Sequence, residues 1–202
     1  MSRYSPRARL TNSSSTSTVA NWFGNQFVLV SGSYESIATA TGTGSSGTIT
    51  FSSVPSTYKH LQIRFIARDT RATTRDDITI GFNSDTGTNY AYHYVYGDGA
   101  SAVAGGGANA GTGYVGSIAA DSASANIVGA GIIDILDYAD TNKFKTVRVL
   151  NGEDQNGSGY VYFNSSLWRS TSAITSIDIK TTSGTRYFTT STTFALYGIK
   201  GE

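Results

Sequence analysis

Apolar and polar residues alternate with a period of two along many short segments of the chain. Successive side chains of a β-strand point to opposite faces, so this alternation predicts strands with one buried and one exposed face. The clearest cases are the apolar sets Leu61, Ile63, Phe65 and Ala67, and Ile78, Ile80 and Phe82. No segment shows a convincing helical period, and the chain therefore has the pattern of an all-β protein.

Segments of this kind follow one another to the end of the chain, separated by glycine-rich or polar turn signals. They include KHLQIRFIAR, DDITIGF, GAGIIDILDY, FKTVRVLNG, GYVYFNSSLW and TTFALYGIKG. About ten strands at a spacing of roughly 10–15 residues are typical of an antiparallel sandwich or jelly roll. We therefore predict an antiparallel jelly-roll-like β-sandwich over residues 33–202, preceded by an extended N-terminal arm over residues 1–32.

Two glycine-rich stretches are expected to be connections. GTGSSG lies between YESIATATG and GTITFSSV, and a short glycine-rich segment between two strand patterns predicts a hairpin loop. Residues 100–113, ASAVAGGGANAGTG, are small and have no apolar period, so we expect a flexible loop there.

The segment NYAYHYVYGDG places four tyrosines at every second position, Tyr90, Tyr92, Tyr94 and Tyr96. In a strand all four rings lie on one face. One interpretation is a packing stripe, which also suits a subunit interface, because tyrosine combines an apolar ring with a polar tip. The other is an exposed platform for a glycan or a partner protein. We favour the packing stripe and retain the platform as the alternative.

Composition points to a surface poor in charge. Only 14% of the residues are charged, against about 25% in average soluble domains, while the chain has 23 glycines and 13 tyrosines. Such a surface suggests an extracellular or particle protein.

The net charge of +1 gives no support for nucleic-acid binding. There is no cysteine, which excludes disulfides, and no apolar run approaches the length of a membrane span.

The first residues have a different character from the rest. Arg3, Arg7 and Arg9 precede any acidic residue, in a segment rich in serine and threonine. Trp22 and Phe23 then begin a short apolar cluster that either docks the arm on a partner or caps the protein's own core. We predict that these five residues dock the arm on a neighbouring subunit, because extended arms can add to a neighbour's sheet and arginines can pair with its acids.

Catalytic and metal-binding patterns are weak. The two histidines, His60 and His93, are interpreted as structural residues. The acid pairs Asp76–Asp77 and Glu153–Asp154 are expected to be solvated acids at strand starts or in loops. Oxygen ligands for calcium occur at Asp134, Asp137, Asp140 and Asn142, but a spacing of three splits the first two between opposite faces of a strand. We predict no enzyme activity, no cofactor and no metal.

Four motifs resemble a known family. GTITFSSVPSTYKHLQIRFIARD, NYAYHYVYGDG, GIIDILDYADTNKFKTV and TTFALYGIKG are similar to segments of small β-sandwich virion structural proteins of tailed bacteriophages, which are associated with tails and fibres. The resemblance covers about residues 33–202. It implies a β-sandwich that serves as a structural, tail or fibre component without catalysis, and it offers no catalytic residues to carry over.

The sequence therefore predicts a virion protein. The leading hypothesis is a tail fibre or baseplate-attached subunit, homotrimeric, that docks by its arm on other virion proteins and presents the sandwich for host-surface contact. One alternative is a capsid decoration (cement) protein, and another is a carbohydrate-binding module that uses the tyrosine row. If the tyrosine row is an exposed platform, a host-surface glycan is a possible partner. Neither nucleic acid nor a membrane is expected as a partner.

Overall fold

The computed structural model describes residues 20–23, 26–29, 32–182 and 185–201. The chain divides into two units, residues 1–32 and residues 33–202. In the first unit β1 (Ala20–Phe23) pairs antiparallel with β2 (Gln26–Leu29), and the pairing sets Trp22 opposite Phe27. All other strands belong to the second unit.

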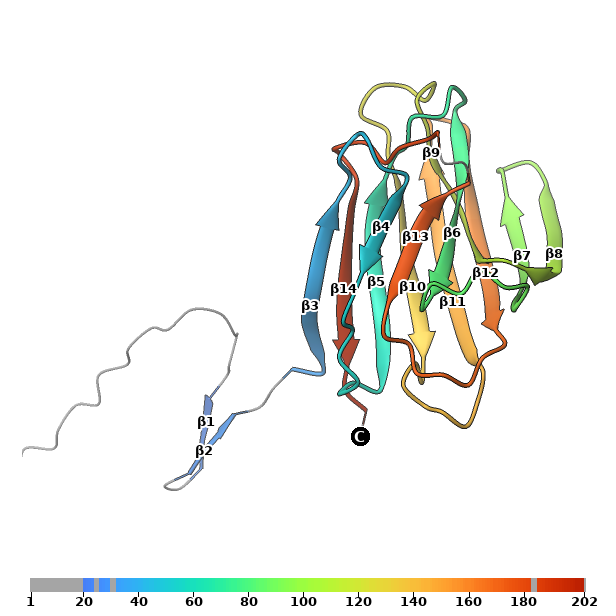
Figure 1. Cartoon of the computed structure of the whole chain (residues 1–202). Helices are drawn as coiled ribbons and strands as arrows, with labels where there is room; N and C mark the ends of the chain where they lie inside the picture. Colours follow the sequence, from blue (N-terminus) through green and yellow to red (C-terminus); the bar gives the residue numbers. More distant parts are fainter. Residues whose placement is uncertain (1–19, 24–25, 30–31, 183–184, 202) are drawn as a thin grey trace, which may run out of the picture. The chain divides into compact units, whose positions relative to one another are not determined.

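The second unit consists of two antiparallel sheets packed face to face (Figure 1). The large sheet has the order β3-β14-β5-β10-β11-β12-β7-β8. Its strands are β3 (Tyr34–Thr41), β14 (Thr193–Ile199), β5 (His60–Ala67), β10 (Gly129–Leu136), β11 (Lys145–Asp154), β12 (Gly159–Trp168), β7 (Tyr90–Gly97) and β8 (Ala102–Ala110). The small sheet has the order β4-β13-β6-β9, with β4 (Thr48–Phe51), β13 (Ile177–Thr181), β6 (Arg75–Phe82) and β9 (Gly113–Ala119).

Eight of these strands form a jelly roll. The chain crosses between the sheets from β3 to β4, β5 and β6, and then from β9 to β10, β13 and β14. The resulting four-stranded arrays, β3-β14-β5-β10 and β4-β13-β6-β9, have the strand order of a jelly roll, in which two Greek keys close a sandwich. The predicted all-β sandwich is confirmed, with twelve strands in the second unit where the sequence pattern predicted about ten.

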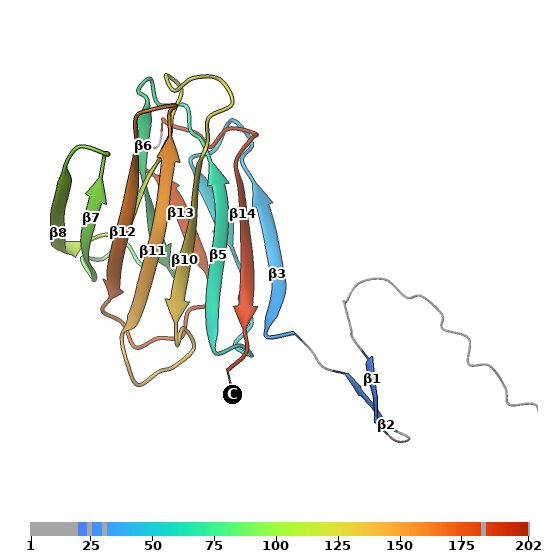
Figure 2. The same cartoon turned by 180° about the vertical axis from the view of Figure 1, so that it is seen from behind.

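The other four strands are two inserted hairpins. β7 and β8 are inserted between β6 and β9, and β11 and β12 between β10 and β13. The hairpins meet where β12 pairs with β7, from Val161 opposite Gly97 to Trp168 opposite Tyr90. They lengthen only the large sheet, and β7 and β8 extend beyond the small sheet, as the two opposite views show (Figures 1 and 2). The inner face of the large sheet therefore continues past β9, the edge strand of the small sheet.

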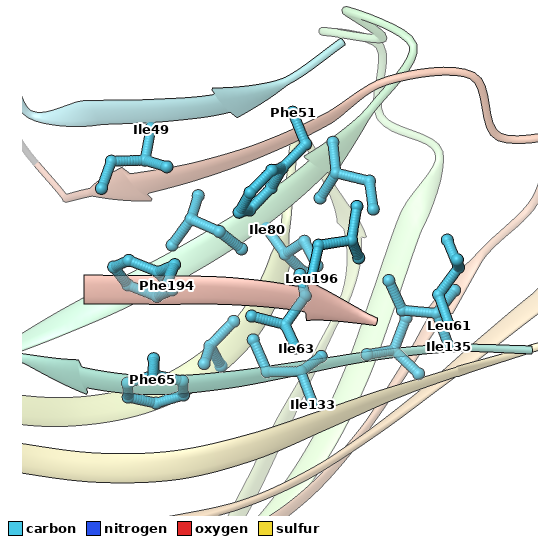
Figure 3. Packing of buried hydrophobic residues seen from close by; sticks show 14 of the residues in the cluster. Ile49, Phe51, Leu61, Ile63, Phe65, Ile80, Ile133, Ile135, Phe194 and Leu196 are labelled. Atoms are coloured by element: carbon cyan, nitrogen blue, oxygen red, sulfur yellow. The ribbon is translucent and has the colours of Figure 1, made fainter. Parts of the chain in front are cut away.

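The core lies between the two arrays of the jelly roll. The alternating residues predicted to share a face do so, and Ile63 from β5 and Ile80 from β6 are fully buried. Figure 3 shows these side chains directed toward one another from β4, β5, β6, β10 and β14. Burial of each such side chain contributes about 1.5–3 kcal/mol. This apolar core holds the edge strand β9 in a fixed position beside the inserted hairpins.

The predicted hairpin around GTGSSG is wrong. β3 pairs with β14 and β4 with β13, so the connection passes from one sheet to the other. Two backbone hydrogen bonds direct it across, because Gly42 N donates to Thr192 O at 3.0 Å and Gly44 N donates to Phe188 O at 2.9 Å. The turn signal was correct, but the strand pairing depends on these distant residues.

Candidate functional site

The tyrosine row of β7 divides into a buried end and a half-exposed part. Tyr90 is fully buried, packs against Phe82 and Trp168, and accepts a hydrogen bond from the backbone N–H of Phe82 at 2.9 Å. Tyr92 and Tyr94 are half-buried and stack with their ring centroids 6.4 Å apart, and Tyr96 continues the row at 6.1 Å from Tyr94. Packing thus accounts for Tyr90, while the other three rings remain partly accessible.

The predicted loop at residues 100–113 is wrong in an informative way. Its central part is the edge strand β8, which sets Gly107 opposite Tyr92 and Gly105 opposite Tyr94. A Cβ atom at Gly105 would lie 2.5 Å from the Tyr94 hydroxyl oxygen, and one at Gly107 would lie 2.8 Å from Cζ of Tyr92. The glycines leave room for the two rings to lie against β8, a pairing in which an aromatic side chain covers an edge glycine.

Three further tyrosines complete an aromatic cluster. Tyr114 of β9 lies 5.4 Å from Tyr92 and 5.2 Å from Tyr94 between ring centroids, so the edge of the small sheet contacts the row. Tyr160 and Tyr162 of β12 lie 5.7 and 4.8 Å from Tyr96. Offset or edge-on ring pairs at such distances contribute about 0.5–1.5 kcal/mol each beyond the area they bury.

A cavity of about 400 Å³ opens beside this cluster, and we call it the tyrosine cleft. Its lining consists of Arg71, Thr73, Thr74, Arg75, Asp76, Asp77, Tyr94, Tyr96, Tyr114 and Tyr162. Aromatic rings thus come from the inserted strands and from β9, whereas the charged groups come from the start of β6 and the residues before it. Rings next to a few fixed polar groups are the usual composition of a small-ligand site.

A β-bulge in β9 aims two residues at the cleft. The pairing with β6 sets Ile78 opposite Gly116 but Thr79 opposite Tyr114, so the register shifts by one residue. Gly116 adopts a φ of 123°, a backbone conformation that residues other than glycine rarely adopt. Because of the extra residue, Tyr114 and Ser117 both reach Asp77, although they are three positions apart. Bulges commonly re-aim side chains in this way.

The hydroxyl groups of the cleft are organised around Asp77. Its Oδ1 accepts hydrogen bonds from Ser117 Oγ at 2.5 Å and from the Tyr114 hydroxyl at 3.1 Å. Ser117 Oγ also lies 3.2 Å from the Tyr162 hydroxyl. Burial and the charge of Asp77 raise the pKa of Tyr114 well above its usual value, so its hydroxyl stays protonated. The network therefore holds the orientation of two rings.

A buried acidic pair, Asp69 and Asp76, adjoins the cleft, and it corrects the expectation that Asp76 is a solvated acid. Asp69 is fully buried and Asp76 is 1% exposed. Arg71 Nη1 donates to Asp76 Oδ1 at 2.6 Å and Arg186 Nη1 donates to Oδ2 at 2.9 Å, and two cations allow this carboxylate to be buried. Glu153 is also buried, at 6% exposure, and accepts a hydrogen bond from Gln155.

The two carboxyl groups of this pair are shifted in opposite directions. Burial and a hydrogen bond with Asp76 raise the pKa of Asp69 to about 7. Burial would also raise the pKa of Asp76, but the hydrogen bonds from Asp69 and Arg71 and the charge of Arg186 lower it below its usual value. The opposite directions favour Asp69 over Asp76 as the carboxyl group that binds a proton.

The remaining predicted residues lie elsewhere. Arg3, Arg7 and Arg9 fall outside the described residues, and Trp22 and Phe23 are in β1 of the first unit. Asp137 forms ion pairs with Lys59 at 2.9 Å and Lys143 at 2.6 Å.

Lys143 also pairs with Asp140, so lysine neutralises two of the four proposed calcium ligands. His60 Nδ1 accepts a hydrogen bond from the backbone of Asp137 at 2.9 Å, in keeping with a structural role. In the described residues, no group of three or more His, Asp or Glu side chains is arranged to hold a metal ion.

Sequence reasoning singled out only part of the cleft. Tyr160 and Tyr162 show the period of two in GYVYF, but nothing local indicates that their strand pairs with β7. Tyr114 is isolated in the sequence, and Arg75 is one of several arginines near a strand start.

Comparison with known proteins finds no matching family model, no matching curated protein and no matching solved structure. In the part of the chain that the structure describes, no helix is long and apolar enough to cross a membrane.

Proposed function

We propose that the chain is a non-enzymatic structural subunit of a bacteriophage particle, attached to the tail fibre or baseplate, whose jelly roll contacts a saccharide of the host surface through the tyrosine cleft. The observation that carries the binding function is the cleft itself. The half-buried rings of Tyr94 and Tyr96 line the cavity beside fixed carboxylate, hydroxyl and guanidinium groups. A sugar has the matching chemistry, because its C–H face packs on an aromatic ring while its hydroxyls need hydrogen-bond partners.

The polar groups of the cleft support binding in preference to catalysis. Asp76 is neutralised by two arginines, and Asp77 accepts hydrogen bonds from Ser117 and Tyr114. Carboxylates held in this way fix the shape of the site, and a general acid or base needs instead to reach the reacting atom of its substrate. The low-charge surface and the resemblance of residues 33–202 to phage virion β-sandwich proteins support assignment to a particle.

Replacement of the accessible tyrosines tests the binding function. We expect Tyr94→Ala and Tyr96→Ala to reduce particle adsorption to host cells at least tenfold, because each removes a ring face that lines the cavity. The matched control is Tyr34→Ala, which removes a 49% exposed tyrosine. Tyr34 lies in β3, the edge strand of the large sheet at the end opposite to β7 and β8. Normal adsorption by both cleft variants would refute the binding function, provided that each variant is incorporated.

Copy number tests the position in the particle. Quantitative mass spectrometry against the major capsid protein should find a few to a few tens of subunits per particle for a fibre or baseplate component. Hundreds of copies would instead identify a capsid decoration protein. Absence of the protein from purified particles would contradict any virion role.

A further inference from the structure

Arg75 differs from Arg71, the other arginine that lines the tyrosine cleft and one that pairs with Asp76. It lines the cavity, is half-buried, and forms no ion pair with any carboxylate in the described part of the chain. Its contacts are with neutral groups: Nη1 donates to the Tyr162 hydroxyl at 2.5 Å, and the guanidinium carbon lies 3.7 Å from the centroid of the Tyr160 ring. The cleft is therefore lined by a permanent positive charge that has no carboxylate of the described residues within ion-pair distance.

The acids nearby accept hydrogen bonds from other groups. Asp76 pairs with Arg71 and Arg186, and Asp77 accepts from Ser117 and Tyr114. The buried Glu153 accepts from Gln155 at 2.7 Å through Oε2, and its Oε1 has no hydrogen-bond partner. Glu153 and Asp77 act on Arg75 only through space. The side chains around Arg75 thus leave most of its hydrogen-bonding capacity unused, since a guanidinium has five N–H donors.

The surroundings of Arg75 also fix its orientation. Tyr160 lies against the guanidinium face, and the Tyr162 hydroxyl, on a side chain only 2% exposed, holds one nitrogen. A planar guanidinium held by its face presents its remaining N–H groups edge-on, which is the arrangement that binds a carboxylate through two parallel hydrogen bonds. The Tyr96 ring lies next to this group, with its centroid 5.9 Å from the guanidinium carbon.

We propose that the ligand of the tyrosine cleft is a saccharide that carries carboxylate groups. Arg75 binds the carboxylate, and the rings of Tyr94 and Tyr96 pack against the C–H faces of the sugar units. This inference rests on the proposed function, because it specifies the class of saccharide that the same cleft takes.

The test compares polymers that differ only in their carboxylates. Full-length protein is titrated with polygalacturonate, alginate, hyaluronate and polysialate, each in its native form and after reduction of the carboxyl groups to alcohols. We expect at least one native polymer to bind, with its reduced form at least tenfold weaker. Equal affinity for a native polymer and its reduced form would overturn the ligand class but leave the saccharide function intact. Failure of every polymer, native and reduced, would overturn both.

Variants of Arg75 test whether this residue causes the preference for native over carboxyl-reduced polymers. Arg75→Gln should lower the ratio of native to reduced affinity to about one, and Arg75→Lys should keep part of it because the charge remains. The matched control is Arg64→Gln, since Arg64 also lies over tyrosine rings, at 5.9 Å from Tyr34 and 5.8 Å from Tyr197, but does not line the cleft. Unfolding midpoints establish that each variant folds. An unchanged ratio in Arg75→Gln, or an equal loss in Arg64→Gln, would refute the role of Arg75.

Discussion

At the scale of single residues, the chain places charge where apolar packing would be expected. Asp69 and Asp76 are buried together beside the cleft, and the two ion-pair partners of Asp76, Arg71 and Arg186, come from segments far apart in the sequence. The carboxyl group of Asp69 has a pKa raised to about 7, chiefly by burial, so the native state holds a proton that the unfolded chain releases near pH 4. Stability therefore depends on pH through this residue.

Asp69→Asn should remove that dependence. Because the folded pKa lies above the unfolded one, the contribution of Asp69 is complete below about pH 4 and is lost as pH rises to about 7. An asparagine imitates the protonated acid, and we expect the free energy of unfolding of the variant to exceed that of the wild type by on the order of 4 kcal/mol at pH 8 but not at pH 4. Urea unfolding across this range measures the difference. Parallel pH profiles for the two proteins would contradict the assignment.

Residue-level prediction from sequence succeeded for the core and failed for the polar interior. Alternation identified Ile63 and Ile80 correctly because burial of one strand face is a local pattern. Asp76 was expected in solvent because its burial depends on Arg186, 110 positions away. No local sequence pattern predicts an ion-pair partner so distant along the chain.

At the scale of elements, the bulge in β9 determines how the cleft is lined. Gly116→Ala should destabilise the protein by more than about 2 kcal/mol, because φ is 123° and the new Cβ would lie 2.3 Å from Asn151 Oδ1. Gly81→Ala in the paired strand β6 is the matched control, since a Cβ there meets nothing within 4 Å, and its effect should stay below about 1 kcal/mol. Thermal unfolding of both variants decides the matter, and equal midpoints would show that the bulge tolerates a side chain.

Strand positions were predicted well, and strand partners poorly. The sequence located β7 and β12 but not their pairing, which joins two hairpins inserted at different points of the jelly roll. β8 was missed because its glycines and alanines carry no apolar period. It is a strand because β7 supplies the backbone hydrogen bonds and the rings that cover it. The composition of the segment alone indicates a loop.

At the scale of the whole molecule, the buried apolar residues that the structure describes as forming the core of the sandwich lie within residues 33–202. Deletion of residues 1–32 should therefore leave the thermal midpoint within about 2 °C of the full chain. Under the proposed function the same deletion should keep the protein out of particles, because the basic arm is the docking segment. Calorimetry and mass spectrometry of purified particles measure the two effects. Normal incorporation of the truncated chain would show that another surface is the anchor.

The inserted hairpins make the large sheet end at β8, whose outer edge pairs with no other strand in the described residues. An unpaired edge is a template for another chain, and this one is nine residues long. Its residues are small and include three consecutive glycines, which have a poor propensity to form β-structure. A strand of another chain that paired with this edge would therefore bury little apolar surface. The glycines that make room for the tyrosine rings therefore also reduce the apolar area that another chain could bury by pairing with this edge.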